Sequence, residues 1–271
     1  MTMLINVLMY ALMVYLMFRM FRLSKRNKKN QQLIKMVNTI EDEAFFDNCD
    51  DYINTIQDMV FENKARIIKL WGMTYKHTYY GFEQLLEDIN IDCLFNPKTG
   101  GIAENEDSFF YMYLAIPNML YADNEIERKA MVFEKLAPYT DRLNSELSKV
   151  IGLCCEKYYQ NEGDRGEEFY KKVIDGDYGG YKYSKSLIGL YKMICNAMLI
   201  KICSERGEDV SEYDGLFRSF AQTGVGKRWC KAIDLELPAE EEPEEPADEP
   251  ETDAETVPEE TETETEKKEE E

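Results

Sequence analysis

The chain has 271 residues, and its 53 acidic side chains outnumber its 32 lysines and arginines to give a formal net charge of −21. This acidic composition argues against nucleic-acid binding, because a nucleic-acid partner needs a positive surface. The seven cysteines are scattered without a C-x-x-C pair, and the chain has one histidine, so we expect reduced cytosolic thiols, no metal site and no cofactor.

The N-terminus combines an apolar run with a basic flank. Residues 1–18 carry no charge and, as a helix, cover about 27 Å, close to the roughly 30 Å of a bilayer's hydrocarbon core. Positive charge stays on the cytoplasmic side, so the order predicts a single-pass cell-membrane protein with its N-terminus outside and its body in the cytoplasm. Six basic residues are expected to flank this span beside anionic lipid headgroups: Arg19, Arg22, Lys25, Arg26, Lys28 and Lys29.

A cleaved signal peptide is the alternative interpretation of this segment. A signal peptide places its positive charge before the apolar region and a small-x-small site after it. Here the charge follows the apolar region, and no Ala-x-Ala is present. We therefore expect an uncleaved transmembrane anchor at 1–22 and a basic juxtamembrane segment at 23–37.

Residues 38–237 are predicted to form one cytosolic α-helical domain. Asn38 and Glu41 resemble a capping box, and apolar residues recur at helical spacing from Phe45 onward. No stretch shows sustained period-two alternation, so the fold class is all-α. After the Phe45 helix, further helices are expected at about 62–75, 81–89, from 107 or 108 to 120 with Pro117 as a kink or new start, 125–136, 141–159, 167–174, 184–204 and 211–220. Loops are expected at 96–101, 163–166 and 175–180.

One helical hairpin resembles a tetratricopeptide repeat (TPR). The matching residues are Ile68, Trp71, Gly72, Tyr75, Phe82, Leu85, Ile89 and Pro97, with one residue inserted between the helices and Leu85 at the family's small Ala position. The resemblance is best over residues 62–97 and implies a scaffold that binds peptides or partner proteins in a concave groove without catalysis. An unrelated helical bundle remains open as the alternative architecture.

Three motifs suggest chemistry but are incomplete. Residues 221–228 resemble a phosphate-binding P-loop, yet Ala221 replaces the first glycine and Arg228 replaces the hydroxyl residue. Asp175 and Asp177 suggest a calcium loop, but Ser186 stands where an EF-hand has glutamate. The single histidine, His77, has no recognisable nucleophile or orienting partner nearby in the sequence. We therefore predict no catalytic residue.

The last segment, 238–271, consists almost entirely of Glu, Asp, Pro, Thr and Ala, and is predicted to be a disordered acidic tail.

Tyrosine and tryptophan offer a large contact area and a hydrogen bond at interfaces. The favoured function is a membrane-anchored adaptor for an unknown protein partner; the alternatives are a membrane-proximal enzyme with carboxylates in a helical cleft and a structural subunit of a membrane assembly. Aromatic residues that could bind the partner are Trp71, Tyr75, Tyr79, Tyr80, Tyr111 and Tyr113.

Overall fold

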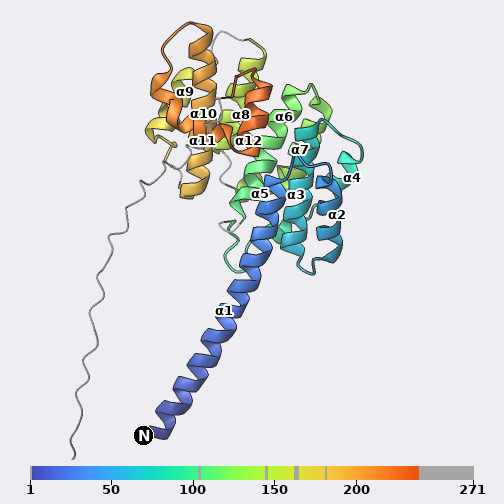
Figure 1. Ribbon diagram of the computed structural model, residues 1–271, viewed down its shortest axis with the longest axis vertical. Helices are drawn as coiled ribbons and strands as arrows, with labels where there is room; N and C mark the ends of the chain where they lie inside the picture. The colour runs from blue at the N-terminus through green and yellow to red at the C-terminus, as the bar shows by residue number, and fades with distance from the viewer. Residues whose placement is uncertain (1, 103–104, 144–145, 162–164, 181, 238–271) are drawn as a thin grey trace, which may run out of the picture. The chain divides into compact units, whose positions relative to one another are not determined.

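The computed structural model describes residues 2–102, 105–143, 146–161, 165–180 and 182–237, and the predicted acidic tail at 238–271 lies outside the described residues. Within the described ranges the regular structure is helical and contains no strand, which confirms the all-α prediction (Figure 1). The α-helices are α1 (Thr2–Asn38), α2 (Phe45–Thr55), α3 (Met59–Lys76), α4 (Phe82–Glu87), α5 (Glu106–Phe110), α6 (Ile116–Ala122), α7 (Ile126–Leu136), α8 (Glu146–Tyr159), α9 (Glu167–Asp175), α10 (Lys185–Glu205), α11 (Asp214–Ala221) and α12 (Gly224–Ala232). Short 3₁₀ turns lie at Asp92–Leu94, Ala137–Arg142 and Ser211–Tyr213.

Helix α1 runs without a break from the predicted membrane span into the folded body (Figure 1). Near its C-terminal end Leu33 and Met36 are buried where α1 packs against α2 and α3. The predicted capping box is wrong, because Asn38 is the last residue of α1 and the next helix begins only at Phe45. The basic juxtamembrane residues therefore belong to the same helix as the apolar run.

Helices α2 and α3 pack closely because a glycine lies at their contact. A Cβ atom on Gly72 would overlap the ring of Phe45, which is fully buried. The neighbouring Trp71 is also fully buried. Helix α3 starts at Asp58, whose carboxylate accepts a hydrogen bond from the backbone N–H of Val60 at 3.2 Å.

The TPR resemblance stays a prediction. Helix α4, which corresponds to the second helix of that hairpin, begins at Phe82 and ends at Glu87, before Ile89. The loop at 96–101 is present as predicted, and is closed by a hydrogen bond from the Asn96 N–H to the carbonyl of Gly101 at 2.8 Å. Neither observation separates a repeat array from another helical bundle.

A wide turn precedes Pro117 in the following helical stretch. The backbone from Glu106 to Ala122 stays helical, but Tyr111–Ala115 forms a π-helical turn between α5 and α6. Proline has no N–H and crowds the preceding turn, which explains why the local hydrogen-bond register changes here. The prediction of a kink or new start at Pro117 is thus met by a change of helix type, with α6 starting at Ile116.

The C-terminal part is organised around α10, which packs against α9 and α11. Ser184 caps its N-terminus by accepting the Leu187 N–H at 3.2 Å. Among the described residues, α10 is the helix that is long and apolar enough to cross a membrane, but 61% of that window is buried inside the fold. Residues such as Ile194 and Met198 are fully buried, so α10 serves as a core helix.

Candidate functional site

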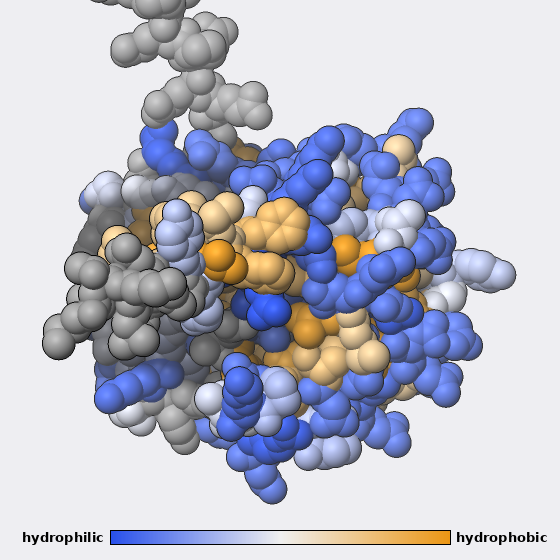
Figure 2. All heavy atoms as spheres, turned by 90° about the horizontal axis from the view of Figure 1, so that it is seen from below, coloured by the Kyte–Doolittle hydropathy of each residue, from blue (hydrophilic) through white to orange (hydrophobic). Residues whose placement is uncertain are grey.

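The most unusual surface of the described chain is the N-terminal half of α1. The side chains from Met9 to Leu23 that the structure describes as large and apolar are all exposed, from 44% at Leu16 to 70% at Met20. Seen from the side toward which α1 extends, hydrophobic side chains gather in the middle of the view and hydrophilic ones surround them (Figure 2). Exposure of so many apolar side chains to water is unfavourable in free energy, so this segment requires an apolar environment or a partner.

The six basic residues of the predicted flank take different positions around α1. Arg19, Arg22, Lys25 and Lys28 are exposed. Lys29 is half-buried and forms an ion pair with Asp58 at 2.7 Å, which ties α1 to the start of α3. The flank therefore has a side that faces the body and a side that faces away from it.

The six aromatic residues predicted to bind a partner do not form one open surface. The prediction is wrong for Trp71 and Tyr113, which are 0% and 4% exposed, because both pack into the core. Tyr111 is half-buried, and its ring centroid lies 5.6 Å from that of Trp71. Tyr75 is half-buried and donates a hydrogen bond to Glu41 at 2.6 Å.

The remaining two aromatics lie at the turn after α3. Tyr80 is 99% exposed, and it is the one member of the six whose side chain lies fully in solvent. Tyr79 donates a hydrogen bond to the carboxylate of Asp123. Burial and this hydrogen bond raise the pKa of Tyr79, so its hydroxyl stays protonated and acts as a donor.

A polar cluster around Asp123 joins three distant parts of the chain. His77 Nδ1 lies 3.0 Å from one Asp123 oxygen, and the guanidinium of Arg228 lies 2.5 Å from the other. Arg228 also donates to the carbonyl of Thr74 at 3.0 Å, and is 2% exposed. The sequence alone gives no partner for His77, because Asp123 lies 46 positions further along the chain. These contacts connect the C-terminal ends of α3 and α6 with α12.

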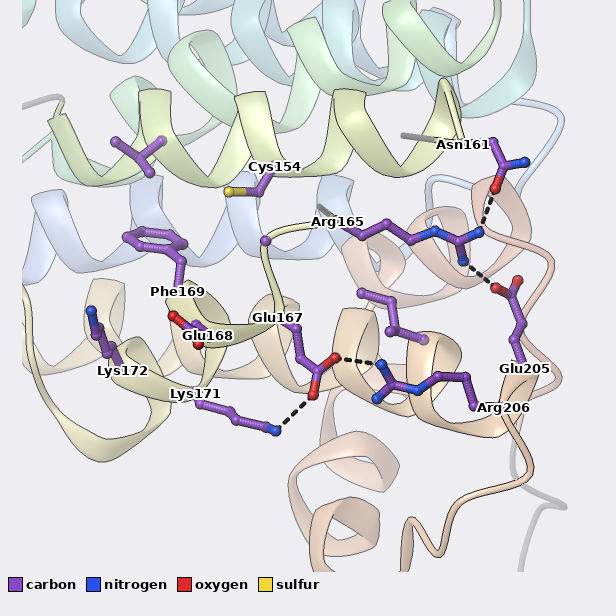
Figure 3. A pocket seen from close by; sticks show the side chains of 13 residues that line it. Cys154, Asn161, Arg165, Glu167, Glu168, Phe169, Lys171, Lys172, Glu205 and Arg206 are labelled. Carbon is purple, nitrogen blue, oxygen red and sulfur yellow. Dashed lines mark hydrogen bonds and ion pairs between the residues drawn. The ribbon is translucent and has the colours of Figure 1, made fainter. Parts of the chain in front are cut away.

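A charged groove of about 1230 Å³ lies between α8, α9 and α10. Figure 3 shows that its charged side chains reach toward one another: Glu167 pairs with both Lys171 and Arg206, each at 2.7 Å. Arg165 pairs with Glu205 across the groove (Figure 3). The pairs Glu167–Arg206 and Arg165–Glu205 hold α9 and the residue before Gly166 against the end of α10.

A second groove, of about 440 Å³, lies between α6, α7 and α8 and is mostly apolar. Ile126 and Leu153 line it while remaining 46% and 57% exposed. The pair Lys129 and Glu156 also lines it, with nitrogen and oxygen 2.5 Å apart. Exposed apolar side chains next to an ion pair are typical of a surface that receives apolar residues of another protein.

Comparison with protein-family models, with curated proteins and with solved structures finds no match to this chain. In the part of the chain that the structure describes, no group of three or more histidine, cysteine and acidic side chains is placed to hold a metal ion. Function must therefore be argued from the surfaces described above.

Proposed function

We propose that this protein is a single-pass membrane-anchored scaffold, whose helical body binds a protein partner at the cytoplasmic face of the cell membrane. The observation that carries the proposal is the exposure of apolar side chains all around α1 from Met9 to Leu23. A helix that packs on a protein buries one stripe, whereas a helix in lipid presents apolar side chains on every side. The basic residues after Phe18 then place the body on the cytoplasmic side.

The groove between α6, α7 and α8 is the surface we assign to the partner. Its exposed residues, Ile126 and Leu153, offer apolar area on a folded support, as an adaptor requires. A TPR-like hairpin array suits this role, because such arrays bind peptides in grooves between helices.

Membrane anchoring is tested by substituting leucines of α1 in the full chain. The variant L12D/L16D places two carboxylates in the proposed span, where each costs roughly 2.5–3.5 kcal/mol of insertion free energy. The matched control L153D/L237D makes the same substitution at leucines that are 57% and 48% exposed on the body. We expect the wild type and the control to stay in the membrane fraction after alkaline carbonate extraction, and L12D/L16D to be released. Extraction of the wild type by carbonate would refute the anchor.

Partner binding is tested by placing a photo-crosslinking amino acid at Leu153 and, as the control, at Leu237. Both leucines are exposed, but only Leu153 lines the groove. We expect a discrete crosslinked species from position 153 in intact cells, and none from position 237. Equal crosslinking from both positions, or none from either, would contradict a partner in this groove.

A further inference from the structure

A cleft of about 390 Å³ lies between α1 and the body, on the side of α1 that faces α3. Four of the six basic residues of the flank line it: Arg22, Lys25, Arg26 and Lys29. Their positions follow the i, i+3, i+4, i+7 spacing, so they share one face of the helix. The other two basic residues, Arg19 and Lys28, do not line the cleft.

The opposite wall of the cleft is formed by the start of α3 and by the loop after the Asp92–Leu94 turn. Phe61 and Phe95 supply apolar surface, and Asn96, Thr99 and Gly101 supply polar groups. The loop is held in shape because the Asn96 side chain accepts the N–H of Thr99 at 3.3 Å, and the backbones of Asn96 and Gly101 pair. The cleft thus has a fixed wall facing a charged helix.

The charges of the cleft select an anion. Among the residues of the lining that the structure describes, the acid is Asp58, which pairs with Lys29 at 2.7 Å. Basic side chains therefore outnumber acidic ones among the described residues of the lining, and two of the basic side chains, Arg22 and Lys25, are exposed. Arginine presents a planar set of donors that matches the oxygens of a phosphate group, and the adjacent phenylalanines provide apolar contact for the carbon atoms next to it.

The basic side of the cleft is long enough to cross the layer of lipid headgroups. Arg22 and Lys29 are seven residues apart, or about 10 Å along a helix. If the hydrocarbon core ends near Arg22, these residues extend across the headgroup layer, which is roughly 5–7 Å thick on each side of a bilayer. We propose that the cleft between α1 and the 95–101 loop binds the phosphate headgroup of an anionic phospholipid of the cytoplasmic leaflet; this assignment rests on the membrane anchoring proposed above.

The experiment measures lipid binding to the full chain in mild detergent by native mass spectrometry. Titration with dioleoylphosphatidylglycerol is compared with dioleoylphosphatidylcholine, for the wild type and for two variants that each remove one arginine and one lysine. R22Q/K25Q changes the cleft, and R19Q/K28Q changes basic residues of α1 that do not line it. All four side chains are exposed, so both variants should keep the fold, as circular dichroism would verify.

We expect the wild type and R19Q/K28Q to prefer phosphatidylglycerol. R22Q/K25Q should bind it about thirtyfold more weakly, because each of the two removed charges contributes about fivefold to the affinity. Equal losses in the two variants would indicate diffuse attraction and overturn the cleft. Competition by millimolar inorganic phosphate would assign the site to free phosphate and overturn the headgroup assignment. Carbonate extraction of R22Q/K25Q separates the lipid-site proposal from the anchor proposal. If this variant loses the anionic lipid but stays in the membrane fraction, the anchor proposal is unaffected.

Discussion

Replacement of Arg228 by methionine should destabilise the body strongly. The substitution keeps the aliphatic part of the side chain but removes the hydrogen bond to the carbonyl of Thr74 and the ion pair with Asp123. Arg228 is 2% exposed and the Asp123 side chain 11%, so water cannot replace these bonds easily. Removing one partner of a buried ion pair costs about 3–5 kcal/mol. Because Asp123 keeps contacts to Tyr79 and His77, we expect about 3 kcal/mol.

The assay is urea unfolding of the full chain in mild detergent, followed by circular dichroism at the helix band. The control is K227M, which removes the neighbouring cation; Lys227 is 38% exposed and lies 3.5 Å from Glu41. This exposed pair should be worth about 0–1 kcal/mol. A thermal scan should show R228M melting about 6–12 °C below the wild type.

Two results would refute this reasoning about Arg228. The first is an R228M midpoint that matches that of K227M, which would mean that the buried cluster adds nothing. The second concerns the double variant R228M/D123N. In R228M alone the Asp123 carboxylate is a buried charge without its cation, whereas in the double variant a neutral amide replaces it. The double variant should therefore lose about 0.5–3 kcal/mol less unfolding free energy than the sum of the losses of the two single variants. Strict additivity would show that Arg228 and Asp123 do not interact.

Three further predictions concern packing, pH and thiol reactivity. The variant G72A should lower the free energy of unfolding by about 1–3 kcal/mol in the same urea assay, because its Cβ would overlap the Phe45 ring; an unchanged midpoint would contradict this packing. Hydrogen bonds from Arg206 and Lys171 lower the pKa of Glu167 to about 2. The ionised Glu167 therefore stabilises the fold above the ordinary glutamate pKa, and this stabilisation is lost as pH falls from about 4.5 to about 2. Because this site is partly exposed, the loss should be at most about 1 kcal/mol, and E167Q should show a flatter dependence of the urea midpoint on pH than the wild type. Burial raises the pKa of Cys93 to about 11, so iodoacetamide at neutral pH should label this half-buried thiol at least tenfold more slowly than a model thiol, as peptide mass spectrometry can measure.

The helices could be predicted from the sequence because their signals are local. The apolar spacing that predicts helices at 125–136 and 184–204 matches α7 and α10 within a residue or two at each end. Ser184, the first residue of the second of these predicted helices, caps α10. The local signal misled at Asn38, because this residue ends the preceding helix and the next helix begins only at Phe45.

The polar cluster and the burial of the aromatic residues could not be predicted, because they depend on contacts between distant segments. In the sequence, Arg228 is only the residue that departs from a P-loop pattern. Its partners could not be predicted because they lie 105 and 154 positions away in the chain. Trp71 and Tyr113 belong to residue types that are common at binding surfaces, and only the tertiary packing around them makes them core residues. The basic flank was visible as a cluster, but the cleft it lines needs the 95–101 loop on the other side.

The continuity of α1 has a mechanical consequence for the proposed anchor. Arg22 and Leu33 are eleven residues apart, or about 17 Å along a helix, with no glycine or proline between them. A flexible tether would let the body swivel freely, but a rigid rod fixed at Leu33 and Met36 transmits every tilt and rotation of the span to the body. With this anchor the bilayer sets the angle at which the helical domain meets its surroundings, and changes in bilayer thickness reorient that domain without any change in its internal structure.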